Sequence, residues 1–262
     1  MLLVGGIVEV PHARASRFSA RLESPVWPAE SPFTDADMRP LDRTSDRLFY
    51  LLPRFMQHVD QPARDSLQRY YASLLETQTE DAPLLDLCAS WTSHLPEDLS
   101  PERRVAAIGM NSLELAANPS ATEWRVQNLN DDTALPYEDN SFAFCTIALS
   151  IDYMTRPIEL LSEVARVLRP GGMVAISFSD RLFFTKAVSH WRDRRRSASA
   201  LLRADVGPSD GYHVWAVGGY LHYTRAFCEA ACADVGAPRG AGASRGADPL
   251  YVVQAVVDKE RF

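Results

Sequence analysis

Residues 1–45 show no regular spacing of apolar side chains. Proline recurs through the second half of this stretch, at Pro25, Pro28, Pro32 and Pro40, and excludes a long helix there. Between Asp60 and Leu75 apolar residues recur at intervals of three and four, and Asp60 and Pro62 are typical of a helix start. The pattern predicts an extended N-terminal arm over residues 1–45 and a helical cap over residues 46–80.

From Pro83 onward, short apolar runs alternate with helical stretches, as in a parallel sheet covered by helices. The clearest helix spans residues 157–168, begins at Pro157 and ends before Pro170. Near the C-terminus the pattern predicts a helix over 224–235, a Gly/Ala-rich loop over 236–247 and a buried strand over 250–257. The other expected strands are residues 84–87, 105–108, 124–127, 142–148 and 173–178.

Composition narrows the class of protein. Of 262 residues, 46% are hydrophobic and 23% charged, which predicts a folded core, and no apolar run reaches the length of a membrane span. The net charge of −7 makes nucleic acid an unlikely partner, and the arginine run at 191–196 is typical of a solvated helix surface. The scattered cysteines Cys88, Cys145, Cys228 and Cys232 indicate a reducing compartment, small core residues and no metal site.

The first 22 residues leave the compartment open. Arg14, Arg17 and Arg21 stand against a single acid, Glu9, as in the remnant of an organellar targeting segment. The opening MLLVGGIVEV is equally compatible with a strand. We therefore expect an intracellular protein, either cytoplasmic or organellar, in a mitochondrion or plastid.

Two motifs give the chain a family resemblance. Residues 157–178, PIELLSEVARVLRPGGMVAISF, resemble the late motif of class I S-adenosylmethionine-dependent methyltransferases, especially the type 11 group. LPYEDNSFAF at 135–144 resembles the stretch that leads into the fourth strand of the same fold. The resemblance covers residues 83–178 and extends more weakly to the C-terminus. It implies S-adenosylmethionine as cofactor and a Rossmann-like α/β domain over 81–262, an open, mostly parallel seven-stranded sheet with helices on both faces.

The turn after the first predicted strand departs from the family pattern. Asp86 matches the family's acidic position, but Cys88, Ala89 and Ser90 replace the glycine-rich turn, and no glycine lies between Gly6 and Gly109. Without glycine a positive φ is costly, and every Cβ takes space near a ligand. LDLCASWTSHLP at 85–96 and GMNSLELAANPS at 109–120 resemble a glycine-poor bacterial and plastid-type branch of the family.

The resemblance assigns cofactor contacts to the ends of the predicted strands. Asn111 is expected to bind the ribose, to cap the following helix, or both. For the adenine, Asn128 is favoured, with Asn130 and Asp131 as alternatives. The implied cofactor-binding residues are Asp86, Cys88, Ala89, Ser90, His94, Gly109, Met110, Asn111, Asn128, Leu129, Ile147 and Ala148.

The sequence marks the residues that would act on the methyl acceptor less clearly. Methyl transfer needs positioning and an apolar site more than a fixed acid or base. If a base assists, His58, Asp152 and His94 are candidates, and Asp152 and Tyr153 are expected at the mouth of the acceptor pocket. Tyr50, Arg54 and His58 are spaced by four residues and would share one face of a helical turn. Arg54 would then pair with the cofactor carboxylate, or else lie on a solvated face.

Three functions remain open. The first is methyl transfer to a small or medium-sized acceptor. The second is a catalytically inactive, methyltransferase-fold accessory subunit of a larger assembly, cytoplasmic or organellar, whose protein partners would hold the N-terminal arm and the 236–247 loop. The third, a nicotinamide oxidoreductase, is disfavoured because no GxGxxG follows the first strand. A cleft filled by the side chain of Trp91 would favour the inactive subunit, and an open cleft the enzyme.

Overall fold

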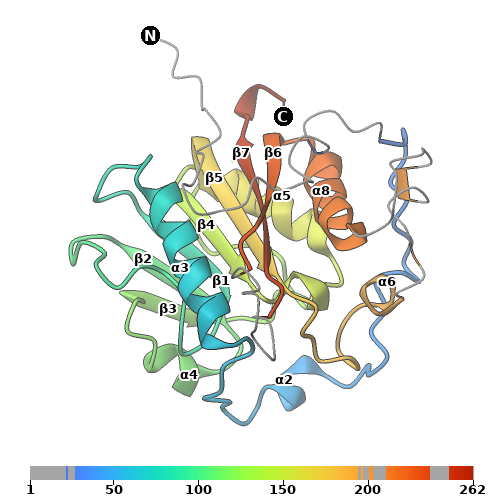
Figure 1. The fold of residues 1–262 in the computed structure, drawn as a ribbon, viewed down its shortest axis with the longest axis horizontal. Coiled ribbons are helices and arrows are strands. Elements are labelled where there is room, and N and C mark those ends of the chain that lie inside the picture. The colour runs from blue at the N-terminus through green and yellow to red at the C-terminus, as the bar shows by residue number, and fades with distance from the viewer. Residues whose placement is uncertain are drawn as a thin grey trace, which may run out of the picture.

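The computed structural model describes residue 22 and residues 27–193, 196, 201–202, 211–236 and 248–261 (Figure 1). The expectations for the arginine-rich N-terminus, for Arg194 and Arg195 of the arginine run and for the 237–247 loop lie outside these residues. Within them, the chain forms a seven-stranded sheet with the strand order β3-β2-β1-β4-β5-β7-β6. The predicted α/β fold is therefore confirmed.

Five strands of the sheet run parallel, and the last two pair antiparallel. The parallel strands are β1 (Leu84–Ala89), β2 (Val105–Gly109), β3 (Glu123–Val126), β4 (Phe142–Ala148) and β5 (Leu168–Phe178). β7 (Tyr251–Val257) lies antiparallel between β5 and β6 (Phe227–Asp234). The direction of strand succession reverses between β1 and β4, and in open α/β sheets ligands bind outside the carboxyl ends of the strands at such a point.

Helices cover both faces of the sheet. α3 (Gln61–Leu75) packs Leu67, Tyr71 and Leu74 on one face, where Phe144 of β4 also points. α5 (Pro157–Val167) and α8 (Tyr212–Thr224) cover the other face, to which the neighbouring residue Cys145 points. The shorter elements are α2 (Asp46–Phe49), α4 (Ser112–Ala116), η1 (Ile151–Tyr153), α6 (Ser189–Arg192) and η2 (Lys259–Arg261). None of the helices in the described part of the chain has the length and apolar character needed to cross a membrane.

The start of α3 shows how the sequence fixes these boundaries. Asp60 is the N-cap, and its side chain accepts a hydrogen bond from the Ala63 backbone N–H at 3.0 Å. Proline follows in the first turn, where its missing N–H costs nothing. The helix predicted from Asp60 to Leu75 is confirmed.

The helix predicted over residues 224–235 is wrong. The segment forms β6, while the helix α8 precedes it and ends at Thr224. Small alanine and cysteine side chains dominate residues 226–233 and leave helix and strand equally compatible, so antiparallel pairing with β7 decides the outcome. Cys228 and Cys232 thus lie in a strand. β5 also begins at Leu168, five residues before its predicted start at 173.

The part of the N-terminal arm that the structure describes wraps around α8. A Cβ on Gly219 of α8 would lie 3.0 Å from ring atoms of both Trp27 and Phe33, so the two aromatic rings rest directly on this glycine. Further along, Pro40 forms an isolated bridge with Val188. These contacts direct the chain to the carboxyl ends of the parallel strands.

Candidate functional site

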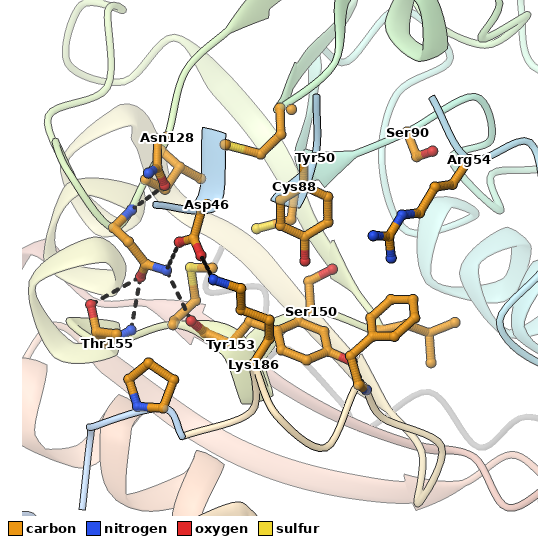
Figure 2. A pocket seen from close by; sticks show the side chains of 18 of the residues that line it. Asp46, Tyr50, Arg54, Cys88, Ser90, Asn128, Ser150, Tyr153, Thr155 and Lys186 are labelled. Carbon is orange, nitrogen blue, oxygen red and sulfur yellow. Dashed lines mark hydrogen bonds and ion pairs between the residues drawn. The ribbon is translucent and has the colours of Figure 1, made fainter. Parts of the chain in front are cut away.

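A cleft of about 530 Å³ lies at the carboxyl ends of β1, β2 and β4 (Figure 2). Its floor is formed by the turns that follow these strands, and residues 42–58, here called the strap, form another wall. In Figure 1 the strap includes α2 and passes along the lower edge of the sheet. The cleft therefore occupies the place where the strand order reverses and where the fold is expected to bind a ligand.

The glycine-free turn after β1 still has a left-handed residue. Cys88 has φ = +58°, a conformation that L-residues adopt at a cost of about 1–2 kcal/mol. Cys88, Ala89 and Ser90 all line the cleft. Burial, assisted by the nearby carboxyls of Asp86 and Asp152, raises the pKa of the Cys88 thiol to about 12, so this thiol is neutral at physiological pH. The turn therefore contributes shape rather than charge.

Space beside this turn comes from the neighbouring strand. Ala89 pairs with Gly109 of β2, and a Cβ on Gly109 would lie 2.1 Å from the Ala89 carbonyl oxygen. Real Cβ atoms do not approach backbone so closely, so only glycine fits at this position. Gly109 and Met110 both line the cleft, as predicted.

Trp91 does not line the cleft. Its ring packs edge-on against Phe55 of the strap, with the ring centroids 6.2 Å apart. The volume above the β1 turn is therefore open, which is the outcome expected of an enzyme and not of the inactive subunit.

Glu114 connects the β1 turn to the strap. Its carboxylate accepts hydrogen bonds from the Ser90 hydroxyl and, at 2.6 Å, from the Arg54 backbone N–H. The Arg54 guanidinium lies 4.1 Å from the centre of the Phe49 ring and 5.1 Å from that of Phe183, in two cation–π contacts. Arg54 lines the cleft, and Figure 2 shows its side chain directed toward the interior.

Two further side chains fasten α2, at the N-terminal end of the strap. The buried Lys186 ammonium donates to the Thr44 carbonyl at 2.6 Å and pairs with Asp46 at 3.1 Å. Asp46 also accepts from the Asn130 side chain, which donates to the Tyr153 carbonyl and accepts from Thr155 (Figure 2). The amide of Asn130 thus joins the strap, the loop after β3 and η1.

Asn111 performs only one of its two expected roles. Its side-chain oxygen accepts from the backbone N–H groups of Leu113 and Glu114, which caps α4. Its side-chain nitrogen donates to the carbonyls of Tyr50 and Leu51 in the strap, each at 3.1 Å. These bonds use both amide hydrogens and both acceptor sites, and Asn111 does not line the cleft. In this structure the Asn111 side chain therefore serves as a helix cap and strap anchor, and its ribose contact stays a prediction.

Asp86 lies beneath the cleft rather than in its lining. It is 2% exposed in the middle of β1 and accepts a hydrogen bond from the Thr146 hydroxyl of β4 at 2.7 Å. Burial raises the pKa of this carboxyl to about 7, although hydrogen bonds with Ser93 and Thr146 favour the charged form. Asp86 thus forms a buried link between the two central strands, and its direct cofactor contact stays a prediction.

Three other predicted cofactor residues do not reach the cleft either. Ile147 is fully buried in the sheet between Leu87 and Ile176, and Ala148 still belongs to β4. The cleft is instead lined by Leu149, whose φ is +51°, and by Ser150. His94, also left-handed at φ = +53°, lies outside the lining, and burial lowers its pKa to about 4.

The loop after β3 lies where the adenine was expected. Asn128, Leu129 and the two alternatives, Asn130 and Asp131, all line the cleft. The Asn128 side chain accepts from the Asn130 backbone N–H at 3.1 Å, which fixes a tight turn. Leu129 is 4% exposed and supplies apolar surface.

An aromatic wall forms the other end of the cleft. Tyr50 and Tyr153, which Figure 2 labels, line it together with Phe183 and His58. The Tyr153 hydroxyl accepts a hydrogen bond from the Phe183 backbone N–H at 2.8 Å, and the His58 ring packs edge-on against Phe183 at 5.5 Å. Desolvation by neighbouring groups lowers the pKa of His58, so its imidazole is neutral at pH 7. Tyr50, Arg54 and His58 therefore do share the face of the strap that meets the cleft, as their spacing predicts.

Asp152 lies behind this wall, not at the mouth of the cleft. It is 5% exposed, and its Oδ2 atom has no hydrogen-bond partner among the described residues. Burial raises its pKa to about 7, against the effects of its own backbone N–H and the Tyr153 hydroxyl. In the structure the buried carboxyl of Asp152 contacts Tyr153, and its contact with the acceptor stays a prediction.

Sequence reasoning missed several lining residues. Glu114 lies in α4, the helix that follows β2, so its proximity to the end of that strand could have identified it. Lys186 and Phe183 come from the connection after β5, and no motif marks them.

Comparisons with known proteins show what part of the chain is similar to a known family. Residues 93–176 match the family described as "Methyltransferase domain". Over 96 residues the chain is 34% identical to a demethylmenaquinone methyltransferase of Staphylococcus epidermidis and 35% identical to one of Staphylococcus aureus. Each match covers 34% of this chain and 40% of the relative, so the chain matches well under half the length of these relatives.

A solved S-adenosylmethionine-dependent methyltransferase from Aquifex aeolicus is also similar in structure. It is 18% identical, with a TM-score of 0.48 over 76% of this chain and 95% of that chain. The family match covers residues 93–176, about a third of the chain, and shows that this segment is similar to a methyltransferase domain.

Proposed function

We propose that this chain, which is similar to a methyltransferase domain over residues 93–176, binds S-adenosylmethionine in the cleft and transfers the methyl group to an apolar, ring-containing acceptor. The observation that carries the proposal is the open cleft above the β1 turn, lined by Cys88–Ser90 and by Gly109. Both of these segments of the lining belong to residues 83–178, which resemble the family, and they lie at the carboxyl ends of the strands.

The residues present fit this cofactor. A volume of about 530 Å³ lies within the range of clefts that hold ligands of this size. Cys88 and Gly109 together give the turn the backbone shape and the clearance that a glycine-rich turn would give. The surrounding side chains are small at the turn, apolar at Met110 and Leu129, and hydrogen-bonding at Asn128.

Glu114 and Arg54 are the charged groups suited to the cofactor's two polar ends. Glu114 lines the cleft just after β2, and we assign to its carboxylate the ribose contact that the sequence gave to Asn111. A carboxylate has about four lone-pair sites, and two hydrogen bonds from this chain leave acceptor capacity. The Arg54 guanidinium, held over Phe49, would pair with the carboxylate of the methionine part.

The aromatic wall would hold the acceptor. When bound, S-adenosylmethionine supplies an electrophilic methyl group. Tyr50, Tyr153 and Phe183 would exclude water and orient a flat, apolar acceptor toward it. The neutral imidazole of His58 could take the proton that the acceptor releases, because its lowered pKa keeps it unprotonated at pH 7. The names of the curated relatives, which act on demethylmenaquinone, agree with an aromatic acceptor of this kind.

Calorimetry with S-adenosylmethionine on the purified chain tests the proposal. We expect binding tighter than about 1 mM, equivalent to roughly 4 kcal/mol. Ser90→Phe would fill the cleft and abolish binding with the fold intact. Ser141→Phe, near the opposite end of the sheet where β4 begins, would bind normally. No heat at millimolar ligand, or equal binding by wild type and Ser90→Phe, would refute the assignment.

A further inference from the structure

Apolar side chains gather on the outer face of the strap. Of ten large apolar side chains that are exposed among the described residues, five lie within residues 48–56. We call these five the apolar ridge: Leu48, Leu51, Leu52, Phe55 and Met56, with exposed fractions of 69%, 66%, 75%, 56% and 56%. Exposed apolar side chains that cluster in this way are typical of a surface that binds a protein or a membrane.

The strap has opposite characters on its two sides. Tyr50 and Arg54 are interleaved with the ridge residues in the sequence, yet they line the cleft. The backbone between them is fixed, because Asn111 holds the Tyr50 and Leu51 carbonyls and Glu114 holds the Arg54 N–H. These bonds keep the apolar residues turned outward, so their exposure is built into the fold and the ridge borders the cleft.

The charged side chains that precede the ridge in the chain also differ in direction, with acidic groups turned inward and arginines exposed. The acidic residues Asp42 and Asp46 turn inward to the buried Lys186, at 3.5 Å and 3.1 Å. Arg39, Arg43 and Arg47 are exposed, and the pair of Arg47 with Asp131 is itself open to solvent, with 75% and 55% exposure. A protein of net charge −7 thus presents apolar side chains that follow three exposed arginines in the chain, the last of which, Arg47, directly precedes Leu48.

We propose that the apolar ridge docks on an anionic lipid bilayer and presents the cleft to an acceptor that resides in the membrane. Apolar side chains beside arginines are the combination that binds the interface of anionic membranes. A second copy is a poorer occupant, because a two-fold contact through the ridge would bring the arginines of both copies together. The membrane-resident acceptor rests on the proposed function, whereas docking of the ridge does not.

Vesicle co-sedimentation of the full chain tests the proposal. The probes are vesicles of phosphatidylcholine alone and vesicles in which phosphatidylglycerol makes up about a quarter of the lipid. We expect the wild type to sediment with the anionic vesicles and much less with the neutral ones. The double variant Leu51→Gln/Leu52→Gln should weaken binding by at least about tenfold. Arg47→Gln should weaken it by about fivefold.

Trp124→Gln is the matched control, because Trp124 is an exposed aromatic residue on the edge strand β3, 45% exposed and outside the strap. It should bind vesicles as the wild type does. Binding that the Leu51/Leu52 variant retains, or no binding by the wild type, overturns the proposal. A wild-type dimer that this variant converts to a monomer, without vesicle binding, assigns the ridge to a second copy instead. Calorimetry with S-adenosylmethionine on the same samples separates failure of docking from failure of the proposed function.

Discussion

Replacing Gly109 by alanine tests the close approach of β2 to the β1 turn. The added Cβ would lie 2.1 Å from the Ala89 carbonyl oxygen and 3.0 Å from Leu115 Cδ2. The oxygen belongs to backbone that is paired with β2 itself, so it cannot swing aside as a flexible side chain would. One strand end must therefore move.

The magnitude follows from two opposing effects. Overpacking of a well-packed core costs about 1–3 kcal/mol, and a clash with backbone belongs at the upper end of that range. Alanine also restricts the unfolded chain, which returns about 0.4–1 kcal/mol. We expect a net loss of about 2 kcal/mol in the free energy of unfolding, or about 4–8 °C in Tm for a chain of this size.

Urea unfolding and calorimetry with S-adenosylmethionine measure the two consequences. Gly109→Ala should lower the urea midpoint and weaken binding, because the displaced turn carries Cys88–Ser90. The control is Gly171→Ala, whose Cβ would meet nothing within 4 Å although its φ is +73°. It should cost no more than about 1 kcal/mol and leave binding unchanged. A Gly109→Ala variant as stable as Gly171→Ala would refute the reasoning.

Three further substitutions test the strap and the buried carboxyl. Asn111→Ala removes the α4 cap and both strap bonds and should lower the free energy of unfolding in urea by about 2 kcal/mol. Asn111→Asp keeps the cap and should lower this free energy by less. Equal losses in the two variants would contradict the capping role. Lys186→Met leaves Asp42 and Asp46 without their buried cation and should lower the free energy of unfolding by about 3 kcal/mol. Arg47→Gln, at an exposed ion pair, should lower it by about 0.5 kcal/mol. Similar losses in the two variants would contradict a stabilising role for the buried ion pairs of Lys186. The folded state keeps the Asp86 proton up to its raised pKa of about 7, while the unfolded chain loses it near its ordinary pKa, so this carboxyl reduces stability as pH rises. The free energy of unfolding of Asp86→Asn, measured relative to that of the wild type, should therefore grow between about pH 4 and about pH 7 and stay constant at higher pH. A difference that does not depend on pH would show that Asp86 is not protonated in the folded state.

The fold was accessible from the sequence wherever apolar spacing was unambiguous. The stripe of 157–168 and the helix after Asp60 bury one face each, so their periodicity is strong. Residues 226–233 carry small side chains that suit a helix or a strand, and only the partner strand β7, distant in sequence, selects the strand. α8 is buried almost all round and therefore lacks the apolar stripe that identifies surface helices.

The site was predictable where topology alone places a residue. Residues that leave a parallel strand at its carboxyl end face the crevice, which accounts for Cys88–Ser90, Met110 and Asn128. Asn111 also leaves a strand, but its side chain turns to bonds with the strap, 60 and 61 residues earlier in the chain. Lys186 contacts the Thr44 carbonyl across 142 residues. Pairings of this range have no local signal in the sequence.

The missing glycines of the β1 turn illustrate why a motif can fail while its geometry persists. Glycine serves such a turn in two ways, by permitting a positive φ and by clearing space for a neighbouring backbone. Here Cys88 adopts the positive φ itself, at a cost of about 1–2 kcal/mol that the packing around β1 can absorb. The clearance is supplied from the other side of the contact, by Gly109 on β2. Since the two requirements are met by residues on different strands, the absence of glycine between Gly6 and Gly109 does not imply the loss of the cleft.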